Sequence, residues 1–347
     1  MRISILCAGF SSPHAGWASI DELASLLAHY LNAELLSPTV APDIWWRRWS
    51  GRQREVYHPM HAQDGDVLLV VARGPTDLGL LAAIPDVRRK YKKIYAWVTD
   101  SYFQAGFGRW TQLYDAITVT AHEDVDYVKD RFGIQVHHLY QGIDALTWAP
   151  RQQFARDIDL IGFGRTPPSY HDCFSSLFHP ADSPYLYLHS PLGHLHGSSV
   201  HQERGMLLKL LQRTRVSLAF HLYVEPQANR PRSMMVTSRW LESLAAGCIV
   251  AGKRPVSRMA DEMLFWDGAT VELDDEPLRA ADQLQALFSQ NDALEPQRRS
   301  NIAHTLSHHD WRDRIHTLCT WFGLPVSAQL STDLEQLQVL AEKYRER

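Results

Sequence analysis

Residues 237–255 read TSRWLESLAAGCIVAGKRP, and their pattern is the most informative in the chain. The stretch opens with Thr237 and Ser238, residue types that begin helices because their side-chain oxygens accept bonds from free backbone N–H groups. Apolar residues then recur at helical spacing: Trp240, Leu241, Leu244 and Ala245. Gly247 stands where a helix end favours the left-handed conformation, and the apolar, partly β-branched residues 248–251 follow it. The stretch therefore predicts a helix that leads into a buried strand of a parallel sheet.

Cations and hydroxyl groups flank this helix and strand. Lys253 and Arg254 follow the strand at its carboxyl end, which is where ligands bind in open α/β sheets. The segment SMMVTSR, residues 233–239, brings hydroxyls and free N–H groups to the start of the helix, and such a helix start favours an anion. We expect a diphosphate to bind here, with four residues as its ligands: Thr237, Ser238, Arg239 and Lys253.

Glu242 interrupts the apolar face of the predicted helix. One interpretation is a carboxylate exposed to solvent, as is usual for glutamate. The other is a carboxylate that accepts hydrogen bonds from two adjacent ribose hydroxyls, a task that suits its two oxygens. A ribose site one helical turn beyond an anion site is the layout of a nucleotide-sugar pocket.

Four segments resemble group 1 glycosyltransferases, a family with the two-domain GT-B fold. RWLESLAAGCIVAG (239–252) resembles their R-F-E-x-x-A-x-G segment, and in particular that of the spore-maturation-type branch with a single glutamate. Three others match in order: DIDLIGFGR (157–165) resembles the first strand of the second domain, RVSLAFH (215–221) the strand before the nucleotide helix, and HHDWRDRIHTL (308–318) the late H-T-x-x-x-R helix. The resemblance covers residues 115–324 and implies transfer of a sugar from a nucleotide-sugar.

One position departs from the family pattern. Many retaining members carry a second glutamate eight positions before the first, and this chain has Met234 there. The contacts to the donor sugar, and the choice between inversion and retention, therefore stay open. The sequence also leaves open the base and sugar of the donor, the acceptor and the oligomeric state.

The composition is that of a globular protein. The chain has 347 residues, enough for about two domains, with 45% hydrophobic and 21% charged residues. Its net charge of −4 gives no electrostatic reason to expect nucleic-acid binding. The four cysteines are scattered without a C-x-x-C pair, and the sequence shows neither a signal-peptide pattern nor an apolar run of membrane-spanning length. We therefore expect a cytoplasmic protein without a transmembrane segment, a disulfide framework or a zinc site.

Short apolar segments alternate with amphipathic ones along the whole chain. Buried strands are expected at residues 3–7, 33–36, 67–72, 94–99, 115–120 and 136–140, and again at 158–163, 185–189, 216–220, 248–251 and 270–273. This alternation predicts an α/β fold with parallel sheets of the doubly wound type. Together with the resemblance, it predicts a GT-B fold, in which two Rossmann-like domains face each other across a cleft.

The expected domain boundaries follow from this pattern. Residues 1–150 would form the acceptor domain and residues 151–330 the nucleotide-sugar domain. The resemblance implies that a terminal helix, residues 331–347, crosses back to the first domain. Thr332 and Glu335 have the spacing of a capping box and predict where that helix begins.

The candidate catalytic bases lie after predicted strands of the first domain. Asp100 ends a strand at the expected cleft and is our first choice for the base of an inverting transfer. The alternative is that Asp100 caps a helix. His14, His122 and Glu123 are the next candidates, although a histidine in a surface loop is the simpler interpretation of His14.

Two arginines are candidate ligands of the leaving diphosphate. Arg165 follows the first strand of the second domain, where a guanidinium would bind phosphate oxygens in a fork. It is alternatively a surface arginine that caps a helix end. Arg232 lies in the loop before the central helix and would hold phosphate or attract the anionic donor. Because these side chains would supply the positive charge, we expect neither a metal nor another cofactor.

Two further segments are rich in aromatic residues or histidines. Residues 41–61 interleave tryptophans with arginines. This pattern indicates a loop packed under its own rings, a surface for a nucleic acid, a polyanion or a membrane face, or part of the acceptor side of the cleft. The histidines of the second domain do not have metal-site spacing, and no carboxylate lies among them: His189, His194, His196 and His201.

We therefore expect a glycosyltransferase that moves a hexosyl or related sugar from a nucleotide-sugar donor to a glycan, protein or small-molecule acceptor. One alternative is a nucleotide-sugar epimerase or hydrolase of the same fold, which would convert the donor without an acceptor. The other is a non-catalytic subunit that binds a nucleotide-sugar, for which binding without turnover would be the evidence.

Overall fold

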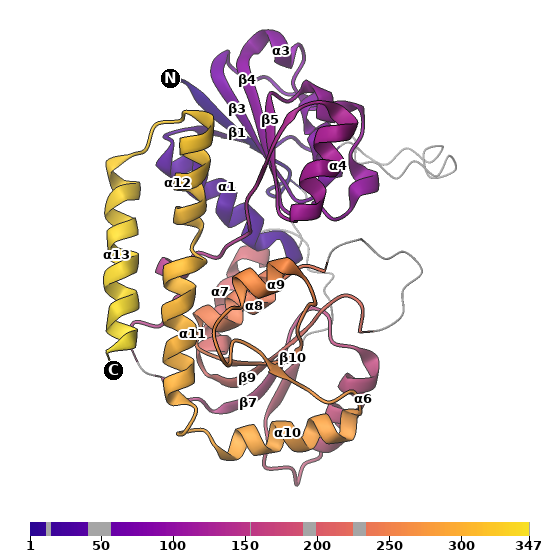
Figure 1. Cartoon of the computed structure of the whole chain (residues 1–347), viewed down its shortest axis with the longest axis vertical. Coiled ribbons are helices and arrows are strands. Elements are labelled where there is room, and N and C mark those ends of the chain that lie inside the picture. The colour runs from indigo at the N-terminus through magenta and orange to yellow at the C-terminus, as the bar shows by residue number, and fades with distance from the viewer. Residues whose placement is uncertain (12–14, 41–56, 153, 190–198, 225–233, 347) are drawn as a thin grey trace.

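The computed structural model describes residues 1–11, 15–40, 57–152, 154–189, 199–224 and 234–346. They form two α/β domains stacked along the long axis of the molecule, with helices from the end of the chain along one side (Figure 1). Some residues discussed above lie outside this description: His14, Arg232, His194, His196 and residues 41–56. None of the described helices has the length and apolar character needed to cross a membrane.

The first domain contains a six-stranded sheet in which all neighbouring strands are parallel. The strands are β1 (Ile3–Cys7), β2 (Glu34–Leu36), β3 (Gly65–Ala72), β4 (Tyr91–Val98), β5 (Ala116–Val119) and β6 (Gln135–His138). Their order in the sheet is β2-β1-β3-β4-β5-β6. β1 is buried along its whole length, as its mostly apolar sequence predicts, because helices cover both faces of a parallel sheet.

Helices of the first domain lie on both faces of this sheet. On one face, α1 (Ala18–Tyr30) places Leu23 and Leu27 in an apolar cluster with Ile5 of β1. On the other face lie the 3-10 helix η2 (Pro75–Ala83) and α4 (His122–Phe132), which contribute Leu81 and Val128 to a second cluster. The shorter helices are η1 (Ala15–Trp17), α3 (Val87–Lys90), η3 (Gln104–Gly106) and η4 (Arg109–Leu113).

The second domain repeats this architecture with five parallel strands. They are β7 (Ile158–Gly162), β8 (Tyr187–His189), β9 (Thr214–Phe220), β10 (Ile249–Lys253) and β11 (Val271–Glu272). Their order, β11-β10-β9-β7-β8, matches β5-β4-β3-β1-β2 of the first sheet when the strands are counted within each domain. In each sheet the chain therefore changes direction beside the first strand, and such a switch point is where doubly wound sheets bind ligands.

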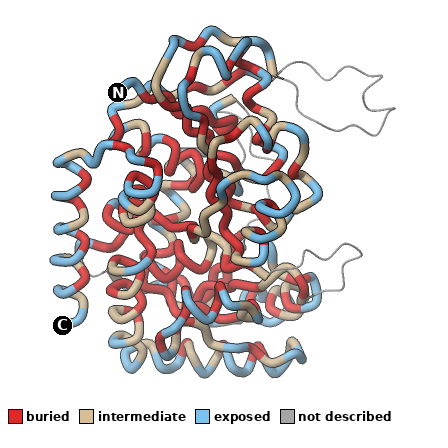
Figure 2. Tube along the Cα trace, turned by 45° about the horizontal axis from the view of Figure 1, so that its top comes forward, coloured by how far each residue is buried: buried red, intermediate tan, exposed pale blue. Residues whose placement is uncertain are grey.

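The helices of the second domain also cover both faces of its sheet. α6 (Pro168–Phe178) and α10 (Pro277–Ser289) share one apolar cluster with β7, β9 and β10. α7 (Ser199–Gln212) and α8 (Ser238–Ala245) lie on the opposite face, together with α9 (Arg258–Met263) and α11 (Glu295–His308). Figure 2 shows buried residues concentrated in the interior of both domains and exposed ones on the outer helices.

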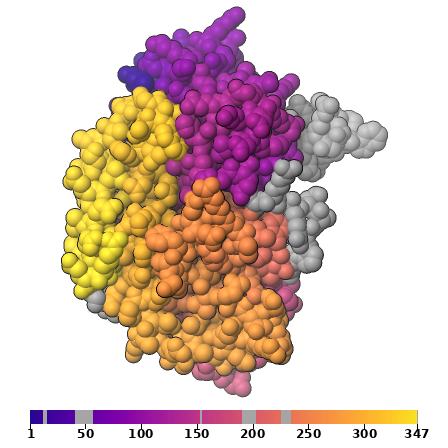
Figure 3. All heavy atoms as spheres, viewed as in Figure 1, coloured from indigo at the N-terminus to yellow at the C-terminus, as the bar shows by residue number. Residues whose placement is uncertain are grey.

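The two domains are joined by the linker helix α5 (Ala145–Trp148) and by the end of the chain. α12 (Trp311–Phe322) packs on the first domain, where the Trp311 ring meets Trp97 edge-on at 5.5 Å and Phe322 stacks on Tyr95 at 4.1 Å. α13 (Ala328–Arg345) then runs back, so that these last helices cover one side of both domains (Figure 3).

This course corrects the prediction for residues 331–347. The helix that crosses to the first domain is α12, and α13 returns from the first domain to the second. Leu330 of α13 belongs to the apolar cluster of the first domain, whereas Leu337 and Ala341 belong to the main cluster of the second. The predicted capping box is also wrong, because the helix begins earlier, with the Ser327 hydroxyl accepting the Leu330 N–H at 3.2 Å.

Candidate functional site

Residues that follow the carboxyl ends of both sheets meet where the two domains touch. From the first domain come Tyr102 after β4, His122 after β5 and Tyr140 after β6. The Tyr140 hydroxyl donates to Glu262 of α9 at 2.6 Å, and a His122 ring nitrogen lies 3.4 Å from the same carboxylate. The two sheets therefore present their ligand-binding ends to each other.

Helix α8 starts at this boundary, as the sequence predicts. Thr237 is its N-cap, with extended backbone, and its hydroxyl is buried without a hydrogen-bond partner among the described residues. Ser238 is the first helical residue. Gly247 adopts the left-handed conformation (φ 76°) just beyond the helix, which only glycine does without strain. A helix start with an unused hydroxyl is suited to accept an anionic group.

Two arginines lie near this helix start, and the side chain of one bonds to the backbone of the other. Arg165, in the loop after β7, is exposed and has no ion-pair partner among the described residues. Arg239, in the first turn of α8, donates from Nη1 to the Arg165 carbonyl oxygen at 2.7 Å and lies 5.9 Å over the Phe163 ring. Burial and the charge of Arg165 lower the pKa of Arg239 to about 10. The positive charges of these two arginines act on each other, and such a pair favours a negatively charged ligand nearby.

Asp100 lies on the first-domain side of the boundary. It follows β4, and burial raises the pKa of its carboxyl to about 7, whereas the interaction with the Tyr102 hydroxyl lowers it. Tyr102 packs against the apolar cluster of the second domain and interacts electrostatically with Arg165. A carboxyl with a pKa near neutrality, placed where the two domains meet, is suited to general acid–base chemistry.

Glu242 is neither exposed nor free. The residue is 4% exposed, and its Oε1 accepts a hydrogen bond from Nη1 of Arg204 on α7. Nη2 of the same arginine donates to Glu22 of α1 at 3.1 Å. The interpretation of Glu242 as a solvated carboxylate is therefore wrong, and the ribose interpretation stays a prediction for a carboxylate already held by an arginine.

Lys253 is paired with carboxylates of its own domain. Its ammonium lies 2.6 Å from Asp275 and 3.5 Å from Glu272, and its side chain is largely buried. Burial alone would lower the pKa of this lysine, but the two carboxylates outweigh that effect and raise it. Its charge is thus already balanced, and the structure gives no support for Lys253 as a phosphate ligand.

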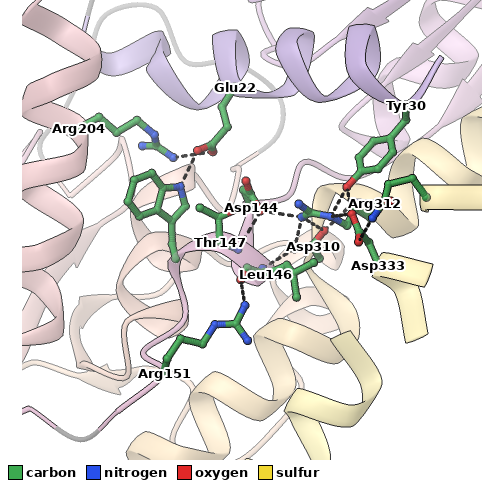
Figure 4. Close-up of polar contacts among 12 residues, drawn as sticks. Glu22, Tyr30, Asp144, Leu146, Thr147, Arg151, Arg204, Asp310, Arg312 and Asp333 are labelled. Carbon is green, nitrogen blue, oxygen red and sulfur yellow. Dashed lines mark hydrogen bonds and ion pairs between the residues drawn. The ribbon is translucent and has the colours of Figure 1, made fainter. Parts of the chain in front are cut away.

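A second buried cluster joins the domains beside the linker, and Figure 4 shows it together with the Glu22 contacts. Arg312 of α12 donates to the Tyr30 hydroxyl of α1 and to Asp144 of the linker, each at 2.6 Å. It also contacts Asp310, and its Nε lies 3.6 Å from Asp333 of α13. One guanidinium therefore fixes α1, the linker and both C-terminal helices relative to one another.

The remaining predictions concern histidines and metal ions. Among the described residues, no group of three or more histidine, cysteine, aspartate and glutamate side chains is arranged to hold a metal ion. His189 lies at the exposed edge strand β8, with its ring 4.5 Å from that of His171. Metal independence stays a prediction.

Sequence reasoning missed Tyr102, Arg204 and Glu22. Tyr102 lies in TDSYFQAGFGRW (99–110), a segment that the strand pattern already assigned to the boundary, so its neighbour Asp100 was the available signal. Arg204 and Glu22 had no such signal, because they are 182 residues apart and only the assembled fold brings them together.

Comparisons with known proteins agree with this architecture. Residues 182–320 match the family model described as "Glycosyl transferase-like". HepE (Alr3699) from Anabaena, solved in complex with UDP-glucose, superposes with a TM-score of 0.50 at 11% identity, over 93% of this chain and 100% of that one. The chain has the GT-B fold.

Two further solved structures are similar. AviGT4, a glycosyltransferase involved in avilamycin A biosynthesis, has 15% identity and a TM-score of 0.46, over 100% of this chain and 96% of its own. TarM from S. aureus, solved as a point mutant with UDP among its ligands, has 10% identity and a TM-score of 0.45 over 74% of this chain. The chain spans 55% of the length of TarM. Among proteins with curated descriptions, none matches.

Proposed function

We propose that the chain is a glycosyltransferase that moves a hexosyl or related sugar from a nucleoside-diphosphate sugar to an acceptor hydroxyl. The observation that carries the proposal is the family match over residues 182–320, which contains α8 with Thr237 and Glu242. The GT-B fold supports it, because the start of this helix lies where the two domains meet.

The second domain would bind the donor. The diphosphate would lie at the start of α8, against the free Thr237 hydroxyl, Ser238 and the guanidinium groups of Arg165 and Arg239. Glu242, one turn further, would accept from the ribose hydroxyls with the oxygen that Arg204 leaves available. As the bond from the anomeric carbon to the diphosphate oxygen breaks, negative charge grows on the leaving group, and fixed cations stabilise it. The reaction proposed here needs no metal for that purpose.

Asp100 would be the base for a transfer with inversion. Its carboxylate would take the proton of the acceptor hydroxyl while the hydroxyl oxygen attacks the anomeric carbon. A pKa near 7 suits this task, because the group is then ionised in a large fraction of molecules at neutral pH and still binds a proton strongly. Tyr102 would hold the carboxylate in position through its hydrogen bond.

The test begins with the donor. Purified protein is incubated with UDP-, GDP-, ADP- and dTDP-sugars in a thermal-shift assay, in which a ligand at about a hundred times its dissociation constant adds about 2.7 kcal/mol. A bound donor is then incubated without and with a panel of acceptors. Transfer to an acceptor supports the proposal, and conversion of the donor alone would favour an epimerase or hydrolase. Binding without any turnover would favour a subunit that is not catalytic. The cytoplasmic location stays a prediction.

A further inference from the structure

Arg204 bridges two carboxylates that belong to different domains. Its Nη1 donates to Oε1 of Glu242 on α8, and its Nη2 donates to Oε2 of Glu22 on α1 at 3.1 Å. Arg204 is 8% exposed, and the Glu22 side chain is also largely buried. Figure 4 shows Arg204 reaching from its helix to Glu22 on the helix opposite. The bridge is therefore shielded from solvent, and buried ion pairs are screened less by salt than exposed ones.

Glu22 is in turn held by the linker. Its other oxygen, Oε1, accepts the indole N–H of Trp148 at 2.6 Å. Trp148 ends the linker helix α5, and its carbonyl accepts a bond from Gln212 of α7 at 2.7 Å. One oxygen of Glu22 thus bonds to the linker and the other to the second domain, so the position of this side chain depends on how the two domains are arranged.

The geometry of a guanidinium makes the two contacts of Arg204 interdependent. Its two terminal nitrogens lie in one rigid plane, so a shift of Glu22 turns the nitrogen that holds Glu242. A lysine has a single ammonium on a flexible chain and cannot hold two carboxylates in this fixed relation. Removing either carboxylate also leaves the buried Arg204 with a poorly compensated charge. The loss of one contact is therefore expected to disturb the other.

We propose that Arg204 is a positioning residue that couples the Glu242 carboxylate to the first domain. The orientation of Glu242, and with it the affinity for a nucleotide, depends on Glu22, which lies on the other domain. The nucleotide part of this inference rests on the proposed ribose role of Glu242, whereas the coupling between Glu22 and α8 does not.

The test compares Glu22→Gln with a matched control. Glutamine at position 22 still accepts the Trp148 N–H but loses the charge that holds Arg204. The control is Asp157→Asn, which removes the charge from the exposed Arg213–Asp157 pair of the second domain. The first readout is amide hydrogen exchange without ligand. We expect faster exchange in α8 of Glu22→Gln and unchanged exchange there in Asp157→Asn.

The second readout is binding of UDP, and of GDP, ADP and dTDP, by calorimetry. We expect Glu22→Gln to lower the affinity for whichever nucleotide binds about tenfold, which is the effect of losing roughly one hydrogen bond to a charged group. In a Glu242→Gln background the same change has little further effect, because the carboxylate it positions is gone. Arg204→Lys behaves like Glu22→Gln.

The outcomes separate the two hypotheses. If none of the four nucleotides binds the wild type, the donor assignment fails, and the exchange data alone decide on the coupling. Unchanged exchange in α8 of Glu22→Gln overturns the coupling. So does faster exchange spread evenly over the second-domain sheet, because that pattern indicates general destabilisation. Additive effects of Glu22→Gln and Glu242→Gln on affinity also contradict the proposal.

Discussion

The Tyr102 hydroxyl lies within hydrogen-bonding reach of the Asp100 carboxyl, and the Tyr102 ring packs against the main apolar cluster of the second domain. Burial raises the pKa of that carboxyl to about 7, whereas the bond from Tyr102 lowers it. The two effects oppose each other, so removing the Tyr102 hydroxyl should change the pKa of Asp100 in a known direction. Because Tyr102 also interacts with Arg165 on the other domain, the pair connects the proposed base to the proposed phosphate ligand.

Asp100→Asn should abolish most of the transfer activity and leave donor binding unchanged. A positioned base contributes about a hundredfold to ten-thousandfold to a rate, and asparagine keeps the shape but cannot take a proton. The measurement is kcat for transfer together with calorimetry of the donor. A variant that retains more than about a tenth of the wild-type kcat would show that another group accepts the proton.

Tyr102→Phe should move the pH dependence of the rate to higher pH. In the wild type, kcat/KM should rise with pH through about 7 as Asp100 becomes ionised. Phenylalanine removes the hydrogen bond that lowers the pKa of Asp100, so the rising limb should lie at a higher pH in the variant. An unchanged pH profile, or one displaced to lower pH, would show that Tyr102 does not lower the pKa of the catalytic base.

The same carboxyl should make the folded state less stable as the pH rises. The pKa of Asp100 is 3.8 when unperturbed and about 7 in the folded protein, so the folded state favours the protonated form. Its contribution to stability is present below pH 3.8 and is lost between pH 3.8 and about 7. Asp100→Asn should therefore unfold at a higher temperature than the wild type at about pH 8, and the difference should shrink towards about pH 4. Thermal denaturation at both pH values measures this.

Arg165→Ala should lower the affinity for a nucleoside diphosphate more than the affinity for the corresponding nucleoside, because the proposed partner of the Arg165 guanidinium is the phosphate. Lys253→Ala is the matched control from the same edge of the sheet, since Asp275 and Glu272 already balance its charge. Its effect on the ratio of the two affinities should be small. Calorimetry with UDP and uridine, or with the pair of whichever base binds, gives the ratio. The same ratio in Arg165→Ala and the wild type would exclude a phosphate contact.

Arg312→Met should destabilise the protein by about 3–5 kcal/mol, because it leaves the buried carboxylates of Asp144 and Asp310 without their cation. Arg213→Met is the comparison, since the Arg213–Asp157 pair is about half exposed and such pairs contribute about 0–1 kcal/mol. Urea denaturation gives both values. Equal losses in the two variants would mean that the cluster around Arg312 does not hold the domains together.

The sequence predicted the features that depend on neighbouring residues, and it could not predict contacts between residues far apart in the chain. The α8 helix, its start at Thr237 and the left-handed Gly247 were predicted correctly, because apolar spacing and helix ends depend on neighbouring residues. The two sheets were predicted for the same reason, since each buried strand is a short apolar run. Contacts such as Arg204 to Glu22 leave no local pattern, because they depend on how two domains are placed.

The C-terminal helices illustrate the same limit. The sequence predicted a packed terminal helix that joins the domains, but it assigned the crossing to the last helix instead of α12. Both helices have apolar faces, and a pattern of apolar residues does not say which surface covers them. The pattern also predicted the N-cap at Thr332, although Ser327 takes that role with the same chemistry five residues earlier.

Deleting α13 should weaken both domains, because its contacts are divided between them. Near its start, Asp333 accepts a hydrogen bond from Tyr30 of α1, and Leu330 lies in the first-domain cluster. Further along the helix, Leu337 and Ala341 pack in the main cluster of the second domain. A protein that ends at residue 326 should therefore lose amide protection in α1 and α12 as well as in α11.

Two point variants separate the halves of this effect. Asp333→Asn should increase exchange mainly in α1 and α12, since it weakens the contacts to Tyr30 and to Arg312. Leu337→Ala should increase exchange mainly in α11, with a loss of about 2–5 kcal/mol for a buried leucine. If α1 keeps its full protection in both the truncated protein and Asp333→Asn, then α13 is a helix of the second domain alone. Protection lost in α1 but kept in α11 would place it with the first.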